Sequence, residues 1–264
     1  MPRLFSELWQ YRHFVISSIR NELKSRFARS KLGGLWVIVN PLSQVLIYAL
    51  ILSNVLAAKM PGVDNTYGYA IYLMAGLLAW SLFIEIITRC LNLFIVQGNL
   101  MKKMSFPRIT LPCIVTGSCL LNYILLFSAM LVIFVFLGHQ FSLVMLWLLP
   151  LTLIVVALAL GIGLTLGILN VFLRDIGQVV PIIIQVWFWF TPIVYPESII
   201  PENYRHLMNL NPMYVIVSAY HKALVFNEAP QVLGIAIVSV VAVALLLLSL
   251  FVFFRANAEM VDVL

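Results

Sequence analysis

Long apolar runs, separated by short polar segments, dominate this chain. A helix needs about 20 mostly apolar residues to cross the roughly 30 Å hydrocarbon core of a bilayer. Six runs reach that length, and we predict a transmembrane helix in each of them: about residues 34–58, 70–96, 110–137, 143–172, 177–195 and 232–255. The predicted fold class is therefore an all-α membrane protein with six transmembrane helices. The fourth run is long for a simple crossing, so we expect it to tilt or to project from the bilayer.

The positions of the cations predict the orientation of these helices. Residues 1–33 carry seven Lys and Arg spread along the segment, without the apolar core of a cleavable signal, so we expect this segment to be retained in the cytoplasm. Of the 16 Lys and Arg, twelve then fall on the inner side, three fall outside, and Arg89 lies within a span. That bias is typical of cytoplasmic loops, and it also places the tail 256–264 inside.

Composition supports the same class. The chain is 63% hydrophobic and 10% charged, with a net charge of +6. We interpret the net charge mainly as an orientation signal, with attraction to anionic lipid headgroups as a second reading. Nothing in the charge pattern implies nucleic acid.

Residues 12–32 predict an amphipathic helix on the inner leaflet. An apolar stripe at helical spacing, with cations away from it, is formed by Val15, Ile16, Ile19, Leu23 and Phe27. An ordinary solvated helix carrying orientation charges is the alternative. Gly33 and Gly34 follow and permit a sharp turn into the first span.

Polar residues within the spans are candidates for a channel or for helix contacts. Asn40, Gln44 and Tyr48 recur every four residues and share one face of the first span, where either a watery pore or helix-to-helix hydrogen bonds would satisfy them. Glu85 and Arg89 are four residues apart and predict an intramembrane ion pair. That pair is either structural or a conformational latch.

The stretch WFWFTPIVYP, residues 187–196, places five aromatic rings around two prolines. Counted from residue 177, Trp187 lies roughly 15 Å deep, too far in for a headgroup belt. Packing between helices and a channel wall along which sugars slide are the two explanations. We choose Gln178, Gln185 and Trp189 as the channel stripe and expect Pro192 to loosen the helix. The other ring candidates for the channel are Trp187, Phe188, Phe190 and Tyr195.

Several kinds of chemistry are missing from the sequence. No Walker A motif is present, and GIGLTLG, residues 161–167, follows no predicted strand, so we interpret it as small-residue helix packing. Neither the three cysteines nor the four histidines show metal-ligand spacing. No acidic cluster suits a transferase acting on lipid-linked sugars. We therefore predict that the chain is not an enzyme and binds no cofactor or metal.

Five motifs, considered together, resemble a known family. RFARSKLGGLWVIVNP (26–41), FPRITLP (106–112), VFLRDIGQ (171–178), FTPIVYP (190–196) and NPM (211–213) are similar to the permease subunits of type-2 ABC exporters of cell-surface polysaccharide. The likeness extends over nearly the whole chain in the right order. It is strongest for O-antigen permeases, with capsule and teichoic acid exporters close.

The resemblance implies a half-transporter in the bacterial inner membrane. Two copies of the permease, a homodimer, would pair with two copies of a separate ATPase that binds ATP and Mg. The substrate would be a polysaccharide on undecaprenyl pyrophosphate. An exporter of a smaller lipid or drug is the nearest alternative, and an integral-membrane transferase is the second.

The resemblance also assigns roles to segments of this chain. It implies that the outer segment 196–231 contains short helices that gate the channel. Cations next to the first span suit the pyrophosphate, although they serve equally as orientation signals: Arg26, Arg29 and Lys31. Contact with the ATPase would fall on the two inner loops, at Lys102, Lys103, Arg108, Arg174 and Asp175.

Overall fold

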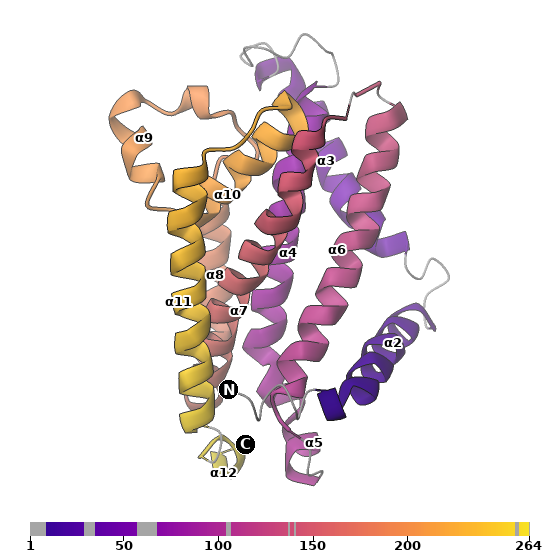
Figure 1. Ribbon diagram of the computed structural model, residues 1–264, viewed down its shortest axis with the longest axis vertical. Helices are drawn as coiled ribbons and strands as arrows, with labels where there is room; N and C mark the ends of the chain where they lie inside the picture. The colour runs from indigo at the N-terminus through magenta and orange to yellow at the C-terminus, as the bar shows by residue number, and fades with distance from the viewer. Residues whose placement is uncertain are drawn as a thin grey trace.

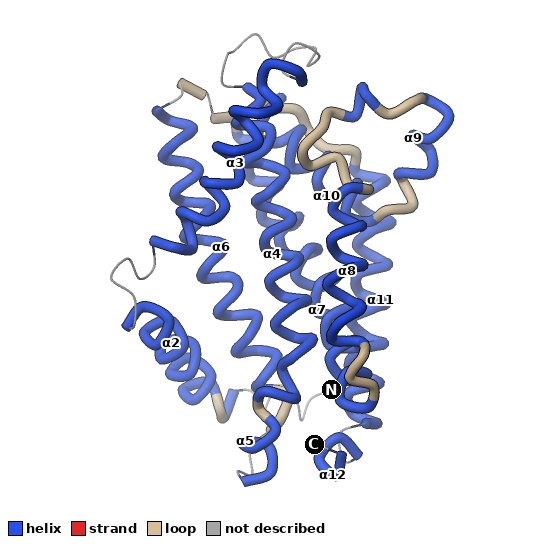
Figure 2. Tube along the Cα trace, turned by 180° about the vertical axis from the view of Figure 1, so that it is seen from behind, coloured by secondary structure: helices blue, strands red, loops and turns tan. Residues whose placement is uncertain are grey.

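The computed structural model describes residues 9–28, 35–56, 68–103, 107–136, 138–139, 141–256 and 259–263. Within these ranges the regular structure is entirely helical, and no strand occurs (Figures 1 and 2). The longer helices are α2 (Arg12–Ala28), α3 (Leu35–Leu56), α4 (Gly68–Val96), α6 (Thr110–Phe136), α7 (Leu148–Phe172), α8 (Ile176–Trp189) and α11 (Val232–Ala256). The short ones are α5 (Gly98–Lys103), η2 (Leu143–Trp147), η3 (Glu197–Ile199), α9 (Glu202–Met208), α10 (Pro212–His221), η4 (Lys222–Phe226) and α12 (Glu259–Val263).

Four helices of the described part are long and apolar enough to cross a membrane: α4, α6, α11 and the continuous helix Leu143–Phe172. This confirms an all-α membrane protein. The predicted fifth span differs, because α8 has only 14 residues and is about 21 Å long. The helix α3 occupies 22 residues of the predicted first span. The total of six crossings stays a prediction.

The helix α4 lies at the centre of the bundle. It packs against α3, α6, α7 and α10, and 78% of the residues in its most apolar 18-residue stretch are buried. Three glycines of α7 allow the neighbouring backbones to approach closely. A Cβ on Gly167 would overlap the carbonyl oxygen of Cys90 in α4, and one on Gly161 would lie 2.7 Å from the Leu245 carbonyl carbon in α11. Small-residue helix packing by GIGLTLG is thereby confirmed.

The chain leaves helical geometry just after α8. The segment Thr191–Val194 is buried and irregular, and hydroxyls of α4 hold it. Tyr69 donates to the Val194 carbonyl at 2.7 Å, and Tyr72 donates to the Pro192 carbonyl at 3.2 Å. Because Pro192 follows the end of the helix, the expectation that it loosens the helix is wrong. The proline inside α8 is Pro181.

The outer segment is broken into the short helices η3, α9, α10 and η4, and α10 is anchored firmly. The Tyr220 hydroxyl lies 3.1 Å from that of Tyr123 in α6 and 3.0 Å from the Thr152 hydroxyl in α7. The His221 ring stacks on Tyr72 with centroids 3.6 Å apart, and burial lowers the pKa of His221 to about 3. The α10 end of the bundle lies opposite α5 and α12 (Figure 1).

We expect Gly167→Val to destabilise the protein, because the added carbons meet the backbone of α4, which has no rotamer to change. Overpacking of this kind costs about 1–3 kcal/mol. The measurement is the thermal unfolding midpoint in detergent. Leu169→Val, on the exposed side of the same helix, is the matched control and should leave the midpoint unchanged. Equal midpoints for the two variants would contradict the close packing of α4 and α7.

Candidate functional site

The helix α2 lies against α6 at the α5 end of the bundle (Figure 1). Ile19 packs over Gly117 of α6, and Val15 and Leu23 are partly buried. Ile16 of the same stripe is 60% exposed, and contact of the stripe with the inner leaflet stays a prediction. Phe27 and Arg26 lie on α2, but their side chains fall outside the described structure. The side facing the protein also carries a charge, Glu22.

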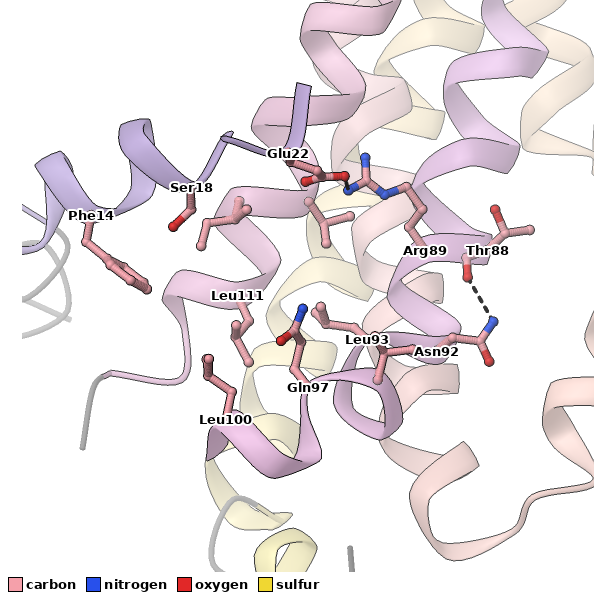
Figure 3. Close-up of a pocket in the computed structure, with 13 residues that line it drawn as sticks. Phe14, Ser18, Glu22, Thr88, Arg89, Asn92, Leu93, Gln97, Leu100 and Leu111 are labelled. Atoms are coloured by element: carbon pink, nitrogen blue, oxygen red, sulfur yellow. Dashed lines mark hydrogen bonds and ion pairs between the residues drawn. The ribbon is translucent and has the colours of Figure 1, made fainter. Parts of the chain in front are cut away.

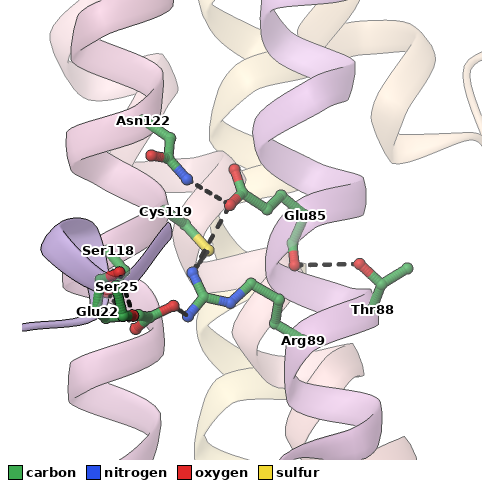
Figure 4. A network of polar contacts seen from close by, with 8 residues as sticks. All are labelled: Glu22, Ser25, Glu85, Thr88, Arg89, Ser118, Cys119 and Asn122. Atoms are coloured by element: carbon green, nitrogen blue, oxygen red, sulfur yellow. Dashed lines mark hydrogen bonds and ion pairs between the residues drawn. The ribbon is translucent and has the colours of Figure 1, made fainter. Parts of the chain in front are cut away.

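Glu22 is the centre of a polar network between α2, α4 and α6 (Figure 4). Its carboxylate accepts hydrogen bonds from Arg89 of α4 and, at 2.7 Å, from the Ser118 hydroxyl of α6. Arg89 also lies 3.6 Å from the Glu85 carboxylate, which confirms the predicted pair. Asn122 of α6 donates to that same Glu85 oxygen at 2.6 Å. The network therefore ties three helices together at one level.

The depth of the network explains how charges survive there. At about 1.5 Å per residue, the 29 residues of α4 span about 43 Å, or about 13 Å more than the hydrocarbon core. If α4 is centred in the bilayer, Arg89 lies about 4 Å inside the hydrocarbon boundary at the α5 end. The Arg89 and Glu22 side chains are 18% and 27% exposed.

Sequence reasoning missed Glu22, whose partner is 67 positions away. A local signal was nevertheless present. Phe14, Ser18 and Glu22 recur every four residues and share one face of α2. A carboxylate on a face that also carries an aromatic ring is unusual for a solvated helix and could have marked a protein contact.

The rings after residue 186 divide into two groups. Trp187 and Phe188 turn toward α4: the Trp187 ring lies 5.2 Å from the Phe83 ring, and the Phe188 ring lies 5.6 Å from Trp80. The Trp187 indole nitrogen also donates to Asn211 at 2.8 Å. These two rings pack between helices.

The second group faces away from the bundle. Trp189 and Phe190 are 56% and 61% exposed, and Gln178 and Gln185 of the chosen stripe are exposed as well. Tyr195 is half-buried, and its hydroxyl donates to the Trp189 carbonyl at 2.8 Å. One face of α8 is therefore exposed in the described part of the chain.

The other predicted site residues are distributed as follows. Asn40 and Gln44 are exposed on α3, while the Tyr48 side chain lies outside the described structure. Arg29 and Lys31 also lie outside the described residues, and of Lys103 only the backbone, in α5, is described. Lys102 is exposed on α5, Arg108 is half-buried before α6, and Arg174 and Asp175 are exposed between α7 and α8.

A buried amide holds the turn that carries Arg174 and Asp175. Asn170 donates from its side chain to the Leu91 carbonyl at 2.9 Å, and its side-chain oxygen accepts from the Gly177 backbone at 2.9 Å. Asn170 therefore fixes the start of α8 against α4. This places the turn at the same end of the bundle as α5 (Figure 2).

The sequence is similar to known transport proteins over most of its length. Residues 14–225 match the family model of the ABC-2 type transporters. The O-antigen export system permease protein RfbA of Myxococcus xanthus is 31% identical over 252 residues, which cover 93% of each chain. A protein of the same name from Klebsiella pneumoniae is 30% identical over 200 residues, or 75% of each chain. The polysialic acid transport protein KpsM of Escherichia coli is 23% identical over 205 residues, or 76% of this chain and 77% of that one.

We expect Arg89→Met to lower the free energy of unfolding by about 2–3 kcal/mol, because it removes the guanidinium that lies beside two partly buried carboxylates. Combining it with Glu22→Gln should restore part of that loss. The measurement is a double-mutant cycle on thermal unfolding in detergent. Lys24→Met, an exposed cation of α2, is the control. Strictly additive effects of the two substitutions would show that Glu22 and Arg89 are not coupled.

Proposed function

We propose a function that proceeds from one premise: this chain belongs to the ABC-2 type transporter family. We assign it as the transmembrane permease subunit of an O-antigen export system in the bacterial inner membrane. The observation that carries the assignment is the similarity to the permease of Myxococcus xanthus over 93% of both chains. The substrate is an O-antigen polysaccharide on undecaprenyl pyrophosphate, moved from the cytoplasmic to the periplasmic side.

Energy for transport comes from outside this chain. The sequence has no Walker A motif, so a separate ABC ATPase subunit binds ATP and Mg, and two copies of it pair with two copies of the permease. The α5 end is the cytoplasmic end in this assignment. It presents Lys102 together with the exposed turn at Arg174 and Asp175, which are suited to contact the ATPase.

The homodimer supplies the missing neighbour of α8. Apolar side chains on the free side of this helix are half exposed or more, among them Ile182, Ile183 and Val186. Gln178, Gln185 and Trp189 accompany them, and a face of mixed rings and amides suits a lumen shared by two copies. Asn40 and Gln44 of α3 are the second candidate stripe.

Ring faces suit a long polymer because a sugar can stack on a ring whatever its position in the polymer. Few hydrogen bonds then have to break each time the polymer moves by one step. A site built from many directional hydrogen bonds would hold the sugar too firmly for continuous movement. The outer segment from η3 to η4 gates the exit in this proposal. At the entrance, Arg26, Arg29 and Lys31 bind the pyrophosphate, for which Arg offers a bidentate fork.

A second candidate function is export of a capsular polysaccharide. It is favoured by the similarity to the polysialic acid transport protein of Escherichia coli, although at 23% identity that likeness is weaker than the O-antigen one. Export of teichoic acid or of a smaller lipid would also use an ABC-2 permease. Exposed rings on α8 favour a sugar polymer over a small lipid.

The function can be tested by reconstituting the chain with its ATPase subunit in proteoliposomes. We expect lipid-linked O-polysaccharide to stimulate ATP hydrolysis and capsular polymer to have no effect. The control is the same lipid carrier without sugar. Stimulation by the capsular polymer alone would transfer the assignment to the second candidate. No stimulation by any lipid-linked polymer would contradict polysaccharide export.

Substitution of Trp189 and of Trp187 distinguishes an effect on transport from an effect on folding. We expect Trp189→Ala to lower polymer export several-fold while the unfolding midpoint is nearly unchanged, because this ring is exposed and faces the proposed lumen. Trp187→Ala should instead lower the stability by about 3 kcal/mol, because it removes a packed ring and its hydrogen bond. Export is measured as surface polymer in a strain lacking the native permease. Unchanged export in Trp189→Ala would remove α8 from the channel wall.

A further inference from the structure

The side chain of Asn211 lies where the end of α8 meets the start of α10. Its oxygen accepts hydrogen bonds from the Trp187 indole nitrogen at 2.8 Å and from the Met213 backbone nitrogen at 3.0 Å. Its nitrogen donates to the Phe190 carbonyl at 3.2 Å and to the Thr191 hydroxyl at 3.1 Å. A primary amide offers two lone pairs on oxygen and two N–H groups. Every hydrogen-bonding position of this side chain is therefore occupied.

The same side chain ends one helix and begins another. Asn211 is the N-cap of α10, because its oxygen accepts from the backbone nitrogen of Met213. At α8 it binds the carbonyl of Phe190, which is the C-cap residue of that helix. The Thr191 hydroxyl, which Asn211 also binds, donates to the Trp187 carbonyl at 3.0 Å. Backbone groups at helix ends lack partners within the helix. These bonds therefore supply the partners and tie the end of α8 to the start of α10.

The helix α10 is in turn held by the rest of the bundle. Tyr220 is fully buried, and its hydroxyl shares hydrogen bonds with side chains of α6 and α7. The ring nitrogen of His221 lies 3.1 Å from a backbone carbonyl of α4. Trp189 and Phe190, the two exposed rings at the end of α8, are thus joined to the core of the bundle through Asn211.

We propose that Asn211 is a positioning residue for polymer export, because it fixes the orientation of Trp189 and Phe190 at the wall of the channel. The inference rests on the proposed function, in which these two rings contact the sugar polymer. Asn211 does not bind the polymer itself, since its amide has no hydrogen-bonding position left for a sugar hydroxyl. A binding group keeps its orientation only where packing and hydrogen bonds hold the residues that support it.

The substitution Asn211→Asp affects only half of these bonds. An aspartate still accepts from Trp187 and Met213, but it cannot donate, and its charge repels the carbonyl oxygen of Phe190. We expect the end of α8 to move while the start of α10 stays capped. The environment of Trp189 is measured by fluorine NMR on the full-length chain labelled with fluorotryptophan. Its signal is assigned by its loss in Trp189→Phe.

Asn211→Asp should shift the Trp189 signal and leave that of Trp9, in the segment before α2, in place. Two controls make the same substitution elsewhere. Asn209→Asp places the charge at an exposed residue near Asn211, and Asn92→Asp places it at the far end of α4 (Figure 3). Neither control should move the Trp189 signal. A Trp189 signal that is the same in Asn211→Asp and in both controls would overturn the positioning role.

The link to export is tested by a double-mutant cycle in proteoliposomes that contain the ATPase subunit. The measured quantity is the concentration of lipid-linked O-polysaccharide that gives half-maximal stimulation of ATP hydrolysis. We expect Asn211→Asp to raise this concentration several-fold in the otherwise unsubstituted chain. It should have little effect when Trp189 and Phe190 are both replaced by alanine, because the rings that Asn211 positions are then absent. An equal effect in both backgrounds would overturn the proposal.

Thr191→Val is a second variant, which keeps the shape of the side chain and removes one of the hydrogen bonds of Asn211. It should also shift the Trp189 signal, by less than Asn211→Asp. If Asn211→Asp does not fold, an unmoved signal in Thr191→Val overturns the positioning role. Absence of polymer stimulation in the unsubstituted chain would contradict the proposed function instead, whereas the fluorine signal would still decide whether Asn211 positions Trp189.

Discussion

The bundle depends on a charge that hydrocarbon cannot accommodate alone. Arg89 lies on the central helix α4, and an unpaired guanidinium within a bilayer costs several kcal/mol. Glu85 on the same helix lies 3.6 Å away, and Glu22 of α2 binds the guanidinium directly. Ser118 and Asn122 of α6 donate hydrogen bonds to those carboxylates. The groups that pair with Arg89 therefore fix the positions of α2, α4 and α6 relative to one another.

Hydropathy predicted the long transmembrane helices, because the length and apolarity of a segment decide whether it can cross the bilayer. Four of the predicted spans appear as long apolar helices with similar limits. The i,i+4 pair of Glu85 and Arg89 was also readable, because a helix brings such residues together. The role of Glu22 could not be read from the sequence, because its partner Arg89 comes from a distant segment. The end of α8 was missed for the same reason, because hydroxyls of Tyr69 and Tyr72 hold the segment after it.

The aromatic cluster shows how one run of residues serves two surfaces. At 100° per residue, consecutive rings cannot share a side of a helix. Trp187 and Phe188 therefore pack on α4, while Trp189 and Phe190 point outward. The helical repeat requires the rings to divide between two sides, but the sequence does not say which ones pack, because that depends on where Phe83 and Asn211 lie. Packing between helices thus explains Trp187 and Phe188, whereas a channel wall at Trp189 and Phe190 stays a prediction.

The shortness of α8 has a consequence for the bilayer itself. A helix of about 21 Å beside spans of about 40 Å creates a hydrophobic mismatch, which a membrane relieves by thinning locally. Local thinning on that side would bring the bilayer surface closer to the buried, irregular segment Thr191–Val194. In a dimer built around this helix, a sugar chain would shed its hydration over only part of the membrane thickness. If the proposed function holds, this geometry would lower the barrier to export before any ring touches the polymer.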